Sequence, residues 1–313
     1  MKIFVTGVAG QLGHDVMNEL NSRGIAGVGS DLAPAYSGIA DGSPVTQMSY
    51  LSLDITDAEA VRRTLMEVRP DAVIHCAAWT AVDAAEDEDK QEKVRLVNVT
   101  GTENIARVCK ELDCKMMYLS TDYVFDGRGT EPWQPDCKDY SPLNVYGQTK
   151  LDGELAVYRN VPKFFIIRIA WVFGKNGKNF IRTMLNLGKT HDTLRVVNDQ
   201  IGTPTYTYDL ARLMVDMILT DKFGYYHATN EGGYISWYDF TKEIFRQALA
   251  LGHPEYSEEH CKVLPVTTAQ YGASKALRPF NSRLDKSKLA ASGFTPLPTW
   301  QDALARYLQE IEF

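Results

Sequence analysis

The stretch KIFVTGVAGQLGHD, residues 2–15, decides the fold class of this chain. A strand-like run, KIFVT, leads into Gly7, Gly10 and Gly13, and apolar residues then recur at helical spacing over residues 12–21. Glycines permit a tight turn and let a pyrophosphate approach the backbone, while the helix N-terminus offers N–H donors and the positive end of its dipole. A glycine loop between a strand and a helix therefore predicts dinucleotide binding at the start of a parallel sheet.

Strand-like and helix-like segments continue to alternate through the first half of the chain. The expected strands are residues 2–6, 25–31, 50–53, 72–78, 115–120 and 164–172, and the expected helices are 12–21, 56–68, 86–112 and 146–158. A capping box is expected at Thr56–Glu59. This alternation favours a doubly wound parallel sheet with helices on both faces.

After about residue 174 the pattern loosens, and helical periods remain at residues 180–187, 209–219, 237–251 and 300–311. We therefore expect an α/β Rossmann fold with a smaller, irregular α/β C-terminal region that binds the substrate. The expected dinucleotide-binding domain is 1–174, with 194–224 returning to it, and the expected substrate-binding domain is 175–193 and 225–313.

The composition is that of an ordinary globular protein, with 313 residues, 44% hydrophobic and 23% charged. A net charge of −7 argues against nucleic acid as the main partner. The longest apolar run, residues 164–174, is interrupted by Arg168 and is too short to span a membrane. The first residues carry no apolar signal segment, and the five cysteines show no Cys-x-x-Cys spacing. We therefore expect a cytoplasmic protein without a nucleic-acid or membrane partner.

Two acidic residues follow expected strands. Asp31 lies 18 residues after Gly13, where a carboxylate binds the adenosine ribose and repels a 2′-phosphate, so it favours NADH over NADPH. The alternative for Asp31 is a loop cap. Asp54 ends the expected third strand and could accept a hydrogen bond from adenine, although a plain Asx turn explains it as well.

The pattern Tyr146-x-x-x-Lys150 places both side chains on one face of an expected helix. A lysine ammonium beside a tyrosine lowers the pKa of the phenol, and the pair can then exchange a proton with a carbonyl oxygen or an alcohol. Thr121 lies at the carboxyl end of an expected strand, the edge at which such sheets bind ligands, and its hydroxyl can orient a substrate carbonyl.

With the glycine loop, Thr121 and Tyr146-x-x-x-Lys150 in this order, the chain resembles the extended short-chain dehydrogenases/reductases. The resemblance implies a Thr–Tyr–Lys triad, a nicotinamide ribose held by Lys150, and a supporting helix asparagine at Asn98. The implied cofactor is NADH or NADPH, with NADH favoured by Asp31. Its implied contacts are Gly7, Gly10, Gln11, Leu12, Gly13, Asp31, Asp54, Ala77, Ala78, Asn98, Tyr146 and Lys150.

Longer strings are similar to one branch, the dTDP-4-dehydrorhamnose reductases; they begin at Ala77, Ser120, Pro142, Arg168, Asn198 and Arg278. This resemblance implies reduction of a 4-keto sugar on dTDP, with Tyr146 as the proton donor. The implied substrate contacts are Thr80, Val82, Asp122, Tyr123, Trp171, Arg278, Asn281 and Ser282. Alternatives are a core position for Trp171 and a surface ion pair for Arg278.

Two differences from the motifs of related enzymes narrow the range of reactions and assemblies that we expect. Nucleotide-sugar dehydratases carry a glutamate base where this chain has Tyr123, which disfavours dehydration. Some reductases of this branch form metal-bridged dimers through glutamates, but Asp15 stands at the first of these positions and residues 189–192 lack the second. We therefore expect no metal, and a monomer or a weak homodimer.

Two other functions stay open. One is an epimerase or a reductase of another nucleotide sugar, which would use the same triad. The other is a non-catalytic subunit resembling the regulatory subunit of methionine adenosyltransferase, although Thr121, Tyr146 and Lys150 are all present.

Overall fold

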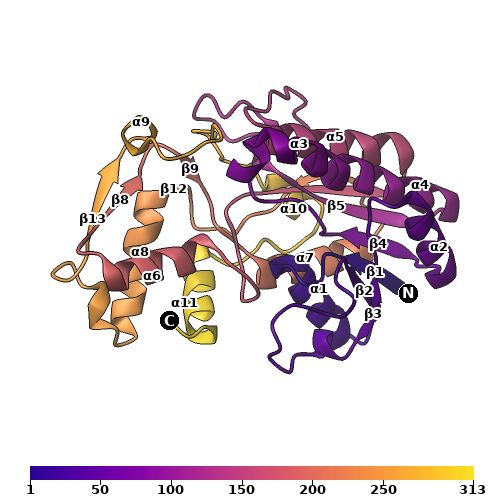
Figure 1. The fold of residues 1–313 in the computed structure, drawn as a ribbon, viewed down its shortest axis with the longest axis horizontal. Coiled ribbons are helices and arrows are strands. Elements are labelled where there is room, and N and C mark those ends of the chain that lie inside the picture. The colour runs from indigo at the N-terminus through magenta and orange to yellow at the C-terminus, as the bar shows by residue number, and fades with distance from the viewer.

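The computed structural model describes all residues, 1–313, and is built around a seven-stranded parallel sheet (Figure 1). The strand order is β11-β6-β5-β4-β1-β2-β3, and every neighbouring pair is parallel. The strands are β1 (Lys2–Thr6), β2 (Ala26–Asp31), β3 (Ser49–Ser52), β4 (Ala72–His75), β5 (Lys115–Thr121), β6 (Phe164–Ile169) and β11 (Gly224–His227). The order reverses between β1 and β4, as in a doubly wound sheet, so the predicted fold class is confirmed.

Helices cover both faces of the sheet, because successive strand residues point to opposite sides. In β1, Ile3 and Val5 join a core with helices α1 (Gln11–Ser22) and α7 (Thr207–Ile218). Phe4, between them, joins the core of the other face. That face is covered by α2 (Ala58–Val68), α4 (Thr102–Leu112) and α5 (Val145–Asn160).

Three local expectations differ from the structure. Helix α2 is capped by Asp57, whose side chain accepts from the Ala60 N–H, so the Thr56–Glu59 capping box is wrong. The long helix expected before β5 is three joined segments, α3 (Glu88–Arg95), a π-helical turn (Leu96–Gly101) and α4. The strand expected over 164–172 breaks at Trp171, whose φ of 51° ends β6 before the short β7 (Val172–Phe173).

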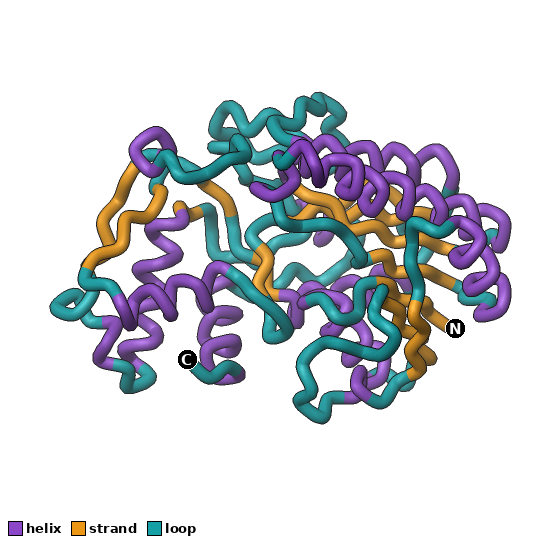
Figure 2. Tube along the Cα trace, in the orientation of Figure 1, coloured by secondary structure: helices purple, strands orange, loops and turns teal.

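The C-terminal region packs around its own hydrophobic core beside the sheet. Its helices are α6 (Phe180–Thr190), α8 (Trp237–Ala250), α9 (Thr268–Tyr271) and α11 (Trp300–Glu310), and α10 (Ser287–Ala291) lies against β11. Short pairs of strands complete it: β8 (Thr193–Val197) with β13 (Lys262–Val266), β9 (Ile201–Gly202) with β12 (Ile235–Ser236), and β7 with β10 (Thr205–Tyr206). Figure 2 shows that long loops connect these elements.

The segment expected to return to the sheet is divided between the two regions. Within residues 194–224, β8 pairs with β13 outside the sheet, whereas α7 packs on α1. Strand β11, which begins at Gly224, adds the edge strand beside β6. None of the helices combines the length and hydrophobicity that a membrane span requires.

Candidate active site

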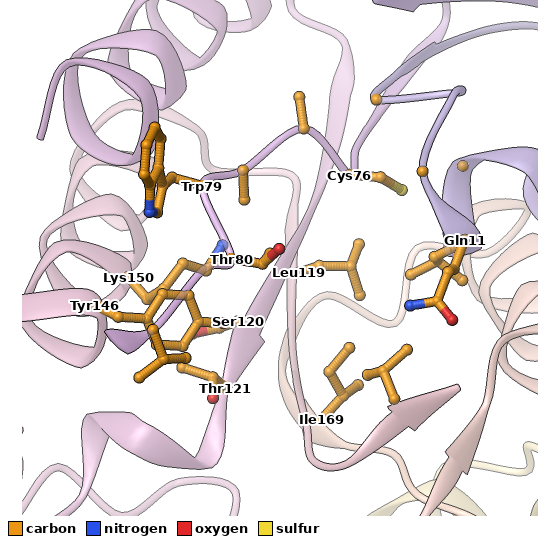
Figure 3. Close-up of a pocket in the computed structure, with 18 of the residues that line it drawn as sticks. Gln11, Cys76, Trp79, Thr80, Leu119, Ser120, Thr121, Tyr146, Lys150 and Ile169 are labelled. Atoms are coloured by element: carbon orange, nitrogen blue, oxygen red, sulfur yellow. The ribbon is translucent and has the colours of Figure 1, made fainter. Parts of the chain in front are cut away.

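A cavity of about 850 Å³ opens at the carboxyl ends of the central strands. Its walls come from the loops after β1, β4 and β5, from α5 and the segment after β6, and from α8 of the C-terminal region. Figure 3 shows Gln11 on one side of the cavity and Tyr146, Lys150 and Trp79 on the other. The cavity thus lies beside β1 and β4, where the strand order reverses and ligands of such sheets bind.

Most residues singled out from the sequence line this one cavity, although they come from distant segments. They are Gly7, Gly10, Gln11, Leu12, Gly13, Asp31, Asp54, Ala77, Ala78, Thr80, Val82, Thr121, Asp122, Tyr123, Tyr146, Lys150, Trp171 and Arg278. The three predicted residues outside its lining are Asn98, Asn281 and Ser282.

The glycine loop is shaped to receive a phosphate group. Gly7 has a φ of 72°, and a Cβ there would lie 2.6 Å from the backbone N of Ala77, so only glycine fits. The first three N–H groups of α1, at residues 11–13, have no backbone acceptor, and Gly10 at the N-cap offers no side chain. These free donors and the helix dipole fit the pyrophosphate of a dinucleotide cofactor.

Asp31 ends β2 beside this loop. Its Oδ2 accepts a hydrogen bond from the Ala9 N–H at 3.0 Å, and its Oδ1 accepts one from the Leu32 N–H at 2.8 Å. Because the side chain also lines the cavity, its remaining lone pairs can accept ribose hydroxyls. Asp54 lines the cavity too, but its Oδ1 forms the Asx turn named above as its alternative, with the Thr56 N–H at 2.9 Å and hydroxyl at 2.7 Å.

Helix α5 presents Tyr146 and Lys150 to the cavity. Asn144 starts the helix, since its side chain accepts from the Gly147 N–H at 2.7 Å. A Cβ at Gly147 would lie 2.4 Å from the carbonyl oxygen of Tyr123, so glycine here lets the helix approach the loop after β5. Helix α5 is therefore placed by its own cap and by one close backbone contact.

Thr121 is the last residue of β5 and lies beside the two α5 side chains (Figure 3). Its hydroxyl oxygen accepts from the Tyr123 N–H at 3.2 Å and donates to Asp122 Oδ1 at 3.1 Å. The structure thus brings Thr121, Tyr146 and Lys150 to one wall of the cavity, as the motif predicts.

The protonation of this group differs from the sequence-based expectation. Burial, and then the carboxyl of Asp122, raise the pKa of Tyr146 above its ordinary value, and its hydrogen-bond partner Thr121 offsets only part of this. Burial lowers the pKa of Lys150 to about 7, despite the opposing effect of Glu154. The expectation that Lys150 lowers the pKa of Tyr146 is therefore wrong for the chain alone, since a lysine that loses its charge stabilises a phenolate little. A protonated Tyr146 is nevertheless the form that a proton donor requires.

Asn98 lies outside the cavity lining and connects two of the segments that form the cavity. It lies in the π-helical turn, a type of irregularity that is frequent at functional sites, and is 1% exposed. Its Oδ1 accepts from the Trp79 N–H at 2.7 Å, and its Nδ2 donates to Thr149 Oγ1 at 3.0 Å. Asn98 thus joins the loop after β4 to helix α5, and it lies outside the cavity in which a cofactor contact was expected.

A buried carboxylate next to Thr121 and a pair of stacked indoles also line the cavity. Burial raises the pKa of the Asp122 carboxyl to about 6, although hydrogen bonds from the Ser282 and Thr121 side chains offset part of the effect. Trp171 lines the cavity and stacks on Trp237, with ring centroids 3.7 Å apart. A left-handed φ at a bulky residue is costly and is typical of functional positions. Trp171 is therefore a wall of the cavity rather than a closed core residue.

Arg278 lines the cavity, and it also forms an ion pair with Asp83, which is the alternative role that the sequence left open. Its Nη1 and Nη2 donate to Asp83 Oδ1 and Oδ2 at 3.0 and 2.7 Å. The Lys275 and Ala276 N–H groups donate to the same carboxylate. A diphosphate at this position would have to share the guanidinium with Asp83.

Asn281 and Ser282, which were predicted to face the diphosphate, lie outside the cavity lining. Asn281 is 1% exposed, and its amide donates to the carbonyl oxygens of Arg128 and Glu131 at 3.2 and 2.9 Å. Ser282 is also buried, and its N–H donates to the Ile201 carbonyl oxygen at 2.8 Å. Asn281 thus holds loops together outside the cavity lining, whereas the Ser282 side chain is a hydrogen-bond partner of the cavity residue Asp122.

Sequence reasoning missed the aromatic side chains that the C-terminal region and β7 contribute. Phe173, Phe180, Trp237 and Phe240 line the cavity. Phe180 and Trp237 are the first residues of α6 and α8, so an aromatic residue at a helix start was the one available signal.

Nothing in the structure resembles a metal centre: no group of three or more histidine, cysteine, aspartate or glutamate side chains is close enough to hold an ion. Asp15 is buried on α1 and accepts from the Thr207 hydroxyl at 2.5 Å. Burial raises the pKa of Asp15 to about 7. Its side chain thus serves the contact between α1 and α7.

Comparison with known proteins supports the relationship inferred from the motifs. Residues 1–313 match the family model described as RmlD substrate binding domain. A dTDP-4-dehydrorhamnose reductase of Streptomyces griseus is 38% identical over 306 residues, which are 96% of this chain and 90% of that protein. The crystal structure of a dTDP-4-dehydrorhamnose reductase from Clostridium acetobutylicum is 37% identical, with a TM-score of 0.85 over 99% of both chains. That of the Bacillus anthracis enzyme, in complex with NADP, is 34% identical, with a TM-score of 0.85 over 99% of this chain and 100% of the other. The chain belongs to the RmlD substrate binding domain family.

Proposed function

We propose that this protein is an NAD(P)H-dependent oxidoreductase that reduces the 4-keto group of dTDP-4-dehydro-L-rhamnose to give dTDP-L-rhamnose. The observation that carries the proposal is the single cavity in which the glycine loop and Thr121, Tyr146 and Lys150 meet. The relatives named dTDP-4-dehydrorhamnose reductase, one of them in complex with NADP, support both the reaction and the cofactor class.

Tyr146, Thr121 and Lys150 have different roles in the proposed reaction. The cofactor, when bound, supplies a hydride to the carbonyl carbon. Tyr146, whose raised pKa keeps it protonated, donates its phenolic proton to the sugar oxygen as negative charge develops there. Thr121 turns its hydroxyl proton from Asp122 Oδ1 to the same sugar oxygen when substrate binds and so orients it, and Lys150 holds the nicotinamide ribose.

The substrate end of the cavity suits a sugar joined to a diphosphate. The Asp122 carboxylate lines the cavity and has lone pairs that can accept a sugar hydroxyl, and the stacked Trp171 and Trp237 offer an apolar wall. Arg278 supplies a cation. Tyr123 stands where dehydratases need a carboxylate base and cannot easily replace it, so elimination is disfavoured.

The proposal favours NADH over NADPH, because Asp31 faces the ribose position and residues 32–48 contain no lysine or arginine for a 2′-phosphate. It also includes a cytoplasmic location and a monomer or a weak homodimer.

For Asp31→Ala we expect the ratio of the NADPH Kd to the NADH Kd to fall about tenfold, since a charged acceptor for the ribose hydroxyls is lost together with a repulsive charge. Titration of each cofactor by fluorescence measures the ratio. Asp89→Ala, which removes an exposed carboxylate outside the cavity, is the matched control. An unchanged ratio in Asp31→Ala would remove this residue from the account of cofactor choice.

The affinity for NADH should depend on pH through Lys150. The pKa of this residue is about 7, so the free protein carries the charge below that pH and loses it above. Because the ammonium is the form that donates to the ribose, we expect the NADH Kd to rise up to about tenfold per pH unit from about pH 7 to about pH 9. Calorimetric titration should show this slope, and Lys150→Met should flatten it. An equal slope in both proteins would mean that another group titrates.

The proposed reaction is tested by following NADH and NADPH absorbance with dTDP-4-dehydro-L-rhamnose. A reductase oxidises one cofactor for each sugar converted. An epimerase would change the sugar without net oxidation, and a regulatory subunit would bind the cofactor without converting the sugar. Either of these results would overturn the proposal in favour of the corresponding alternative.

A further inference from the structure

The segment between β7 and α6, residues 174–179, which we call the strap, is built onto the glycine loop. Asn176 is 5% exposed, and its Nδ2 donates to the carbonyl oxygens of Ala9 and Gly10 at 2.9 and 3.2 Å. Asn179 Nδ2 donates to Gln11 Oε1 at 3.1 Å. The strap thus fixes the turn whose N–H groups face the cavity.

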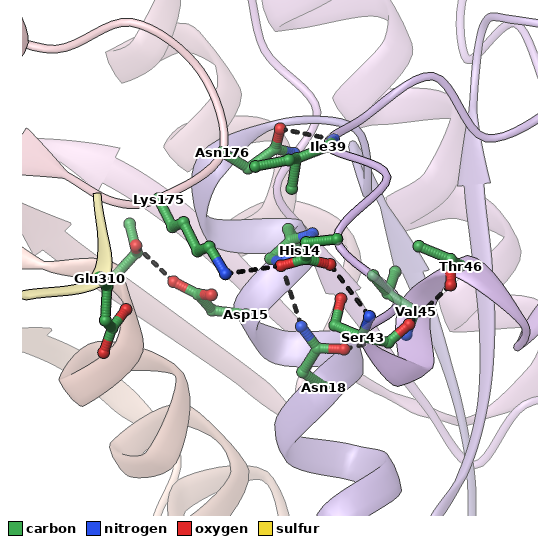
Figure 4. A network of polar contacts seen from close by, with 12 residues as sticks. His14, Asp15, Asn18, Ile39, Ser43, Val45, Thr46, Lys175, Asn176 and Glu310 are labelled. Carbon is green, nitrogen blue, oxygen red and sulfur yellow. Dashed lines mark hydrogen bonds and ion pairs between the residues drawn. The ribbon is translucent and has the colours of Figure 1, made fainter. Parts of the chain in front are cut away.

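The other side of the strap is fastened to the loop that follows Asp31. Asn176 Oδ1 accepts from the Ile39 N–H at 3.0 Å, and Lys175 Nζ donates to Asp41 at 2.9 Å. Figure 4 shows Asn176 and Lys175 reaching toward this loop, beside His14. With its amide oxygen and nitrogen both engaged, Asn176 connects the strap, the glycine loop and residues 32–48.

Lys178 also belongs to the strap, but it makes none of the contacts that connect the strap to the glycine loop and to residues 32–48. It is exposed, it lines the cavity together with Gly10 and Gln11, and it makes no ion pair or side-chain hydrogen bond within the chain. Its neighbour Asn179 caps α6 by accepting from the Arg182 N–H at 3.1 Å, which fixes the backbone next to Lys178. An unpaired cation is therefore held at the edge of the phosphate-binding turn.

We propose that the strap completes the cofactor's phosphate site: Lys178 contacts the pyrophosphate, and Asn176 is the positioning residue that holds both Lys178 and the turn in place. The free N–H groups at residues 11–13 bind the phosphates from one side, and the ammonium of Lys178 neutralises them from the other. Cofactor binding thus depends on a segment outside the β1–α1 unit. The inference rests on dinucleotide binding and not on the identity of the sugar.

Lys178→Gln tests the contact in the full-length protein without substrate. We expect the NADH Kd to rise about five- to twentyfold, as for the loss of a partly exposed charge-assisted hydrogen bond, and Lys178→Arg to recover most of the affinity. High salt should shrink the difference, because it screens exposed charges. Lys189→Gln, also exposed but at the far end of α6 and outside the cavity, is the matched control and should bind NADH normally.

Two further titrations identify the phosphate that is bound. ADP-ribose should lose affinity in Lys178→Gln as NADH does, and dTDP should not. Loss confined to dTDP would assign Lys178 to the substrate and overturn the proposal, as would an unchanged NADH Kd. No NADH or NADPH binding by the unaltered protein would instead refute the proposed function itself.

A double-mutant cycle tests the positioning role of Asn176. If Asn176→Ala releases the strap, Lys178→Gln should raise the NADH Kd less in that background than in the unaltered protein. Additive effects, with the fold intact by circular dichroism, would show that Asn176 does not position Lys178.

Discussion

Tyr146→Phe should lower kcat by about 10²- to 10⁴-fold, because general acid catalysis contributes about this much and the variant has no proton to donate. The ring is kept, so its edge-to-face contact with Tyr123, with ring centroids 5.7 Å apart, should persist. The NADH Kd should change little, since the lost hydroxyl is not the main cofactor contact. Steady-state rates and fluorescence titration measure the two quantities separately.

Tyr208→Phe is the control for this variant, because Tyr208 is 44% exposed on α7 and does not line the cavity. It should have the kcat of the unaltered protein. A Tyr146→Phe variant with full kcat would show that another group protonates the sugar oxygen, and the proposed roles would have to be reassigned.

Arg168→Met should lower the free energy of unfolding by about 3–5 kcal/mol, the usual cost of breaking a buried ion pair. Arg168 on β6 donates to both carboxylate oxygens of Glu154 on α5, at 2.9 and 2.8 Å, and neither side chain is exposed to solvent. Arg168 also donates to the Pro135 carbonyl oxygen at 3.0 Å. The variant would leave Glu154 as an unpaired charge in the core behind the catalytic helix.

Denaturant unfolding measures the loss, and Arg62→Met is the control. Arg62 pairs with Glu111 on the surface, where such a contact contributes at most about 1 kcal/mol. A double variant with Arg168→Met and Glu154→Leu should recover part of the loss, because no unpaired charge remains. A loss below about 1 kcal/mol for Arg168→Met alone would contradict this view of the core.

The sheet, the glycine loop and the catalytic helix could be predicted because each is encoded locally. The consecutive apolar residues of β1, the spacing of Gly7, Gly10 and Gly13, and the spacing Tyr146-x-x-x-Lys150 are each visible within a short segment. Parallel strands then bring their carboxyl ends to one edge whatever the loops do, so Thr121 had to lie near the glycine loop.

The remaining features depend on contacts between distant segments. The pairing of Arg278 with Asp83 joins residues 195 positions apart, and Trp171 meets Trp237 only because the C-terminal region folds over the sheet. The raised pKa of Tyr146 could not be predicted either, since burial and the carboxyl of Asp122 cause it, and both depend on the folded surroundings. The contacts of Asn281 are also between distant segments, since its amide binds the backbone carbonyls of Arg128 and Glu131.

The most direct test of the proposed chemistry is transfer of deuterium from NADH labelled at nicotinamide C4, with the label on the transferred face. With dTDP-4-dehydro-L-rhamnose as the substrate, we expect dTDP-L-rhamnose with one deuterium at sugar C4, detected by NMR and mass spectrometry. Product without label at C4, or label at another carbon, would contradict hydride delivery to the 4-keto group.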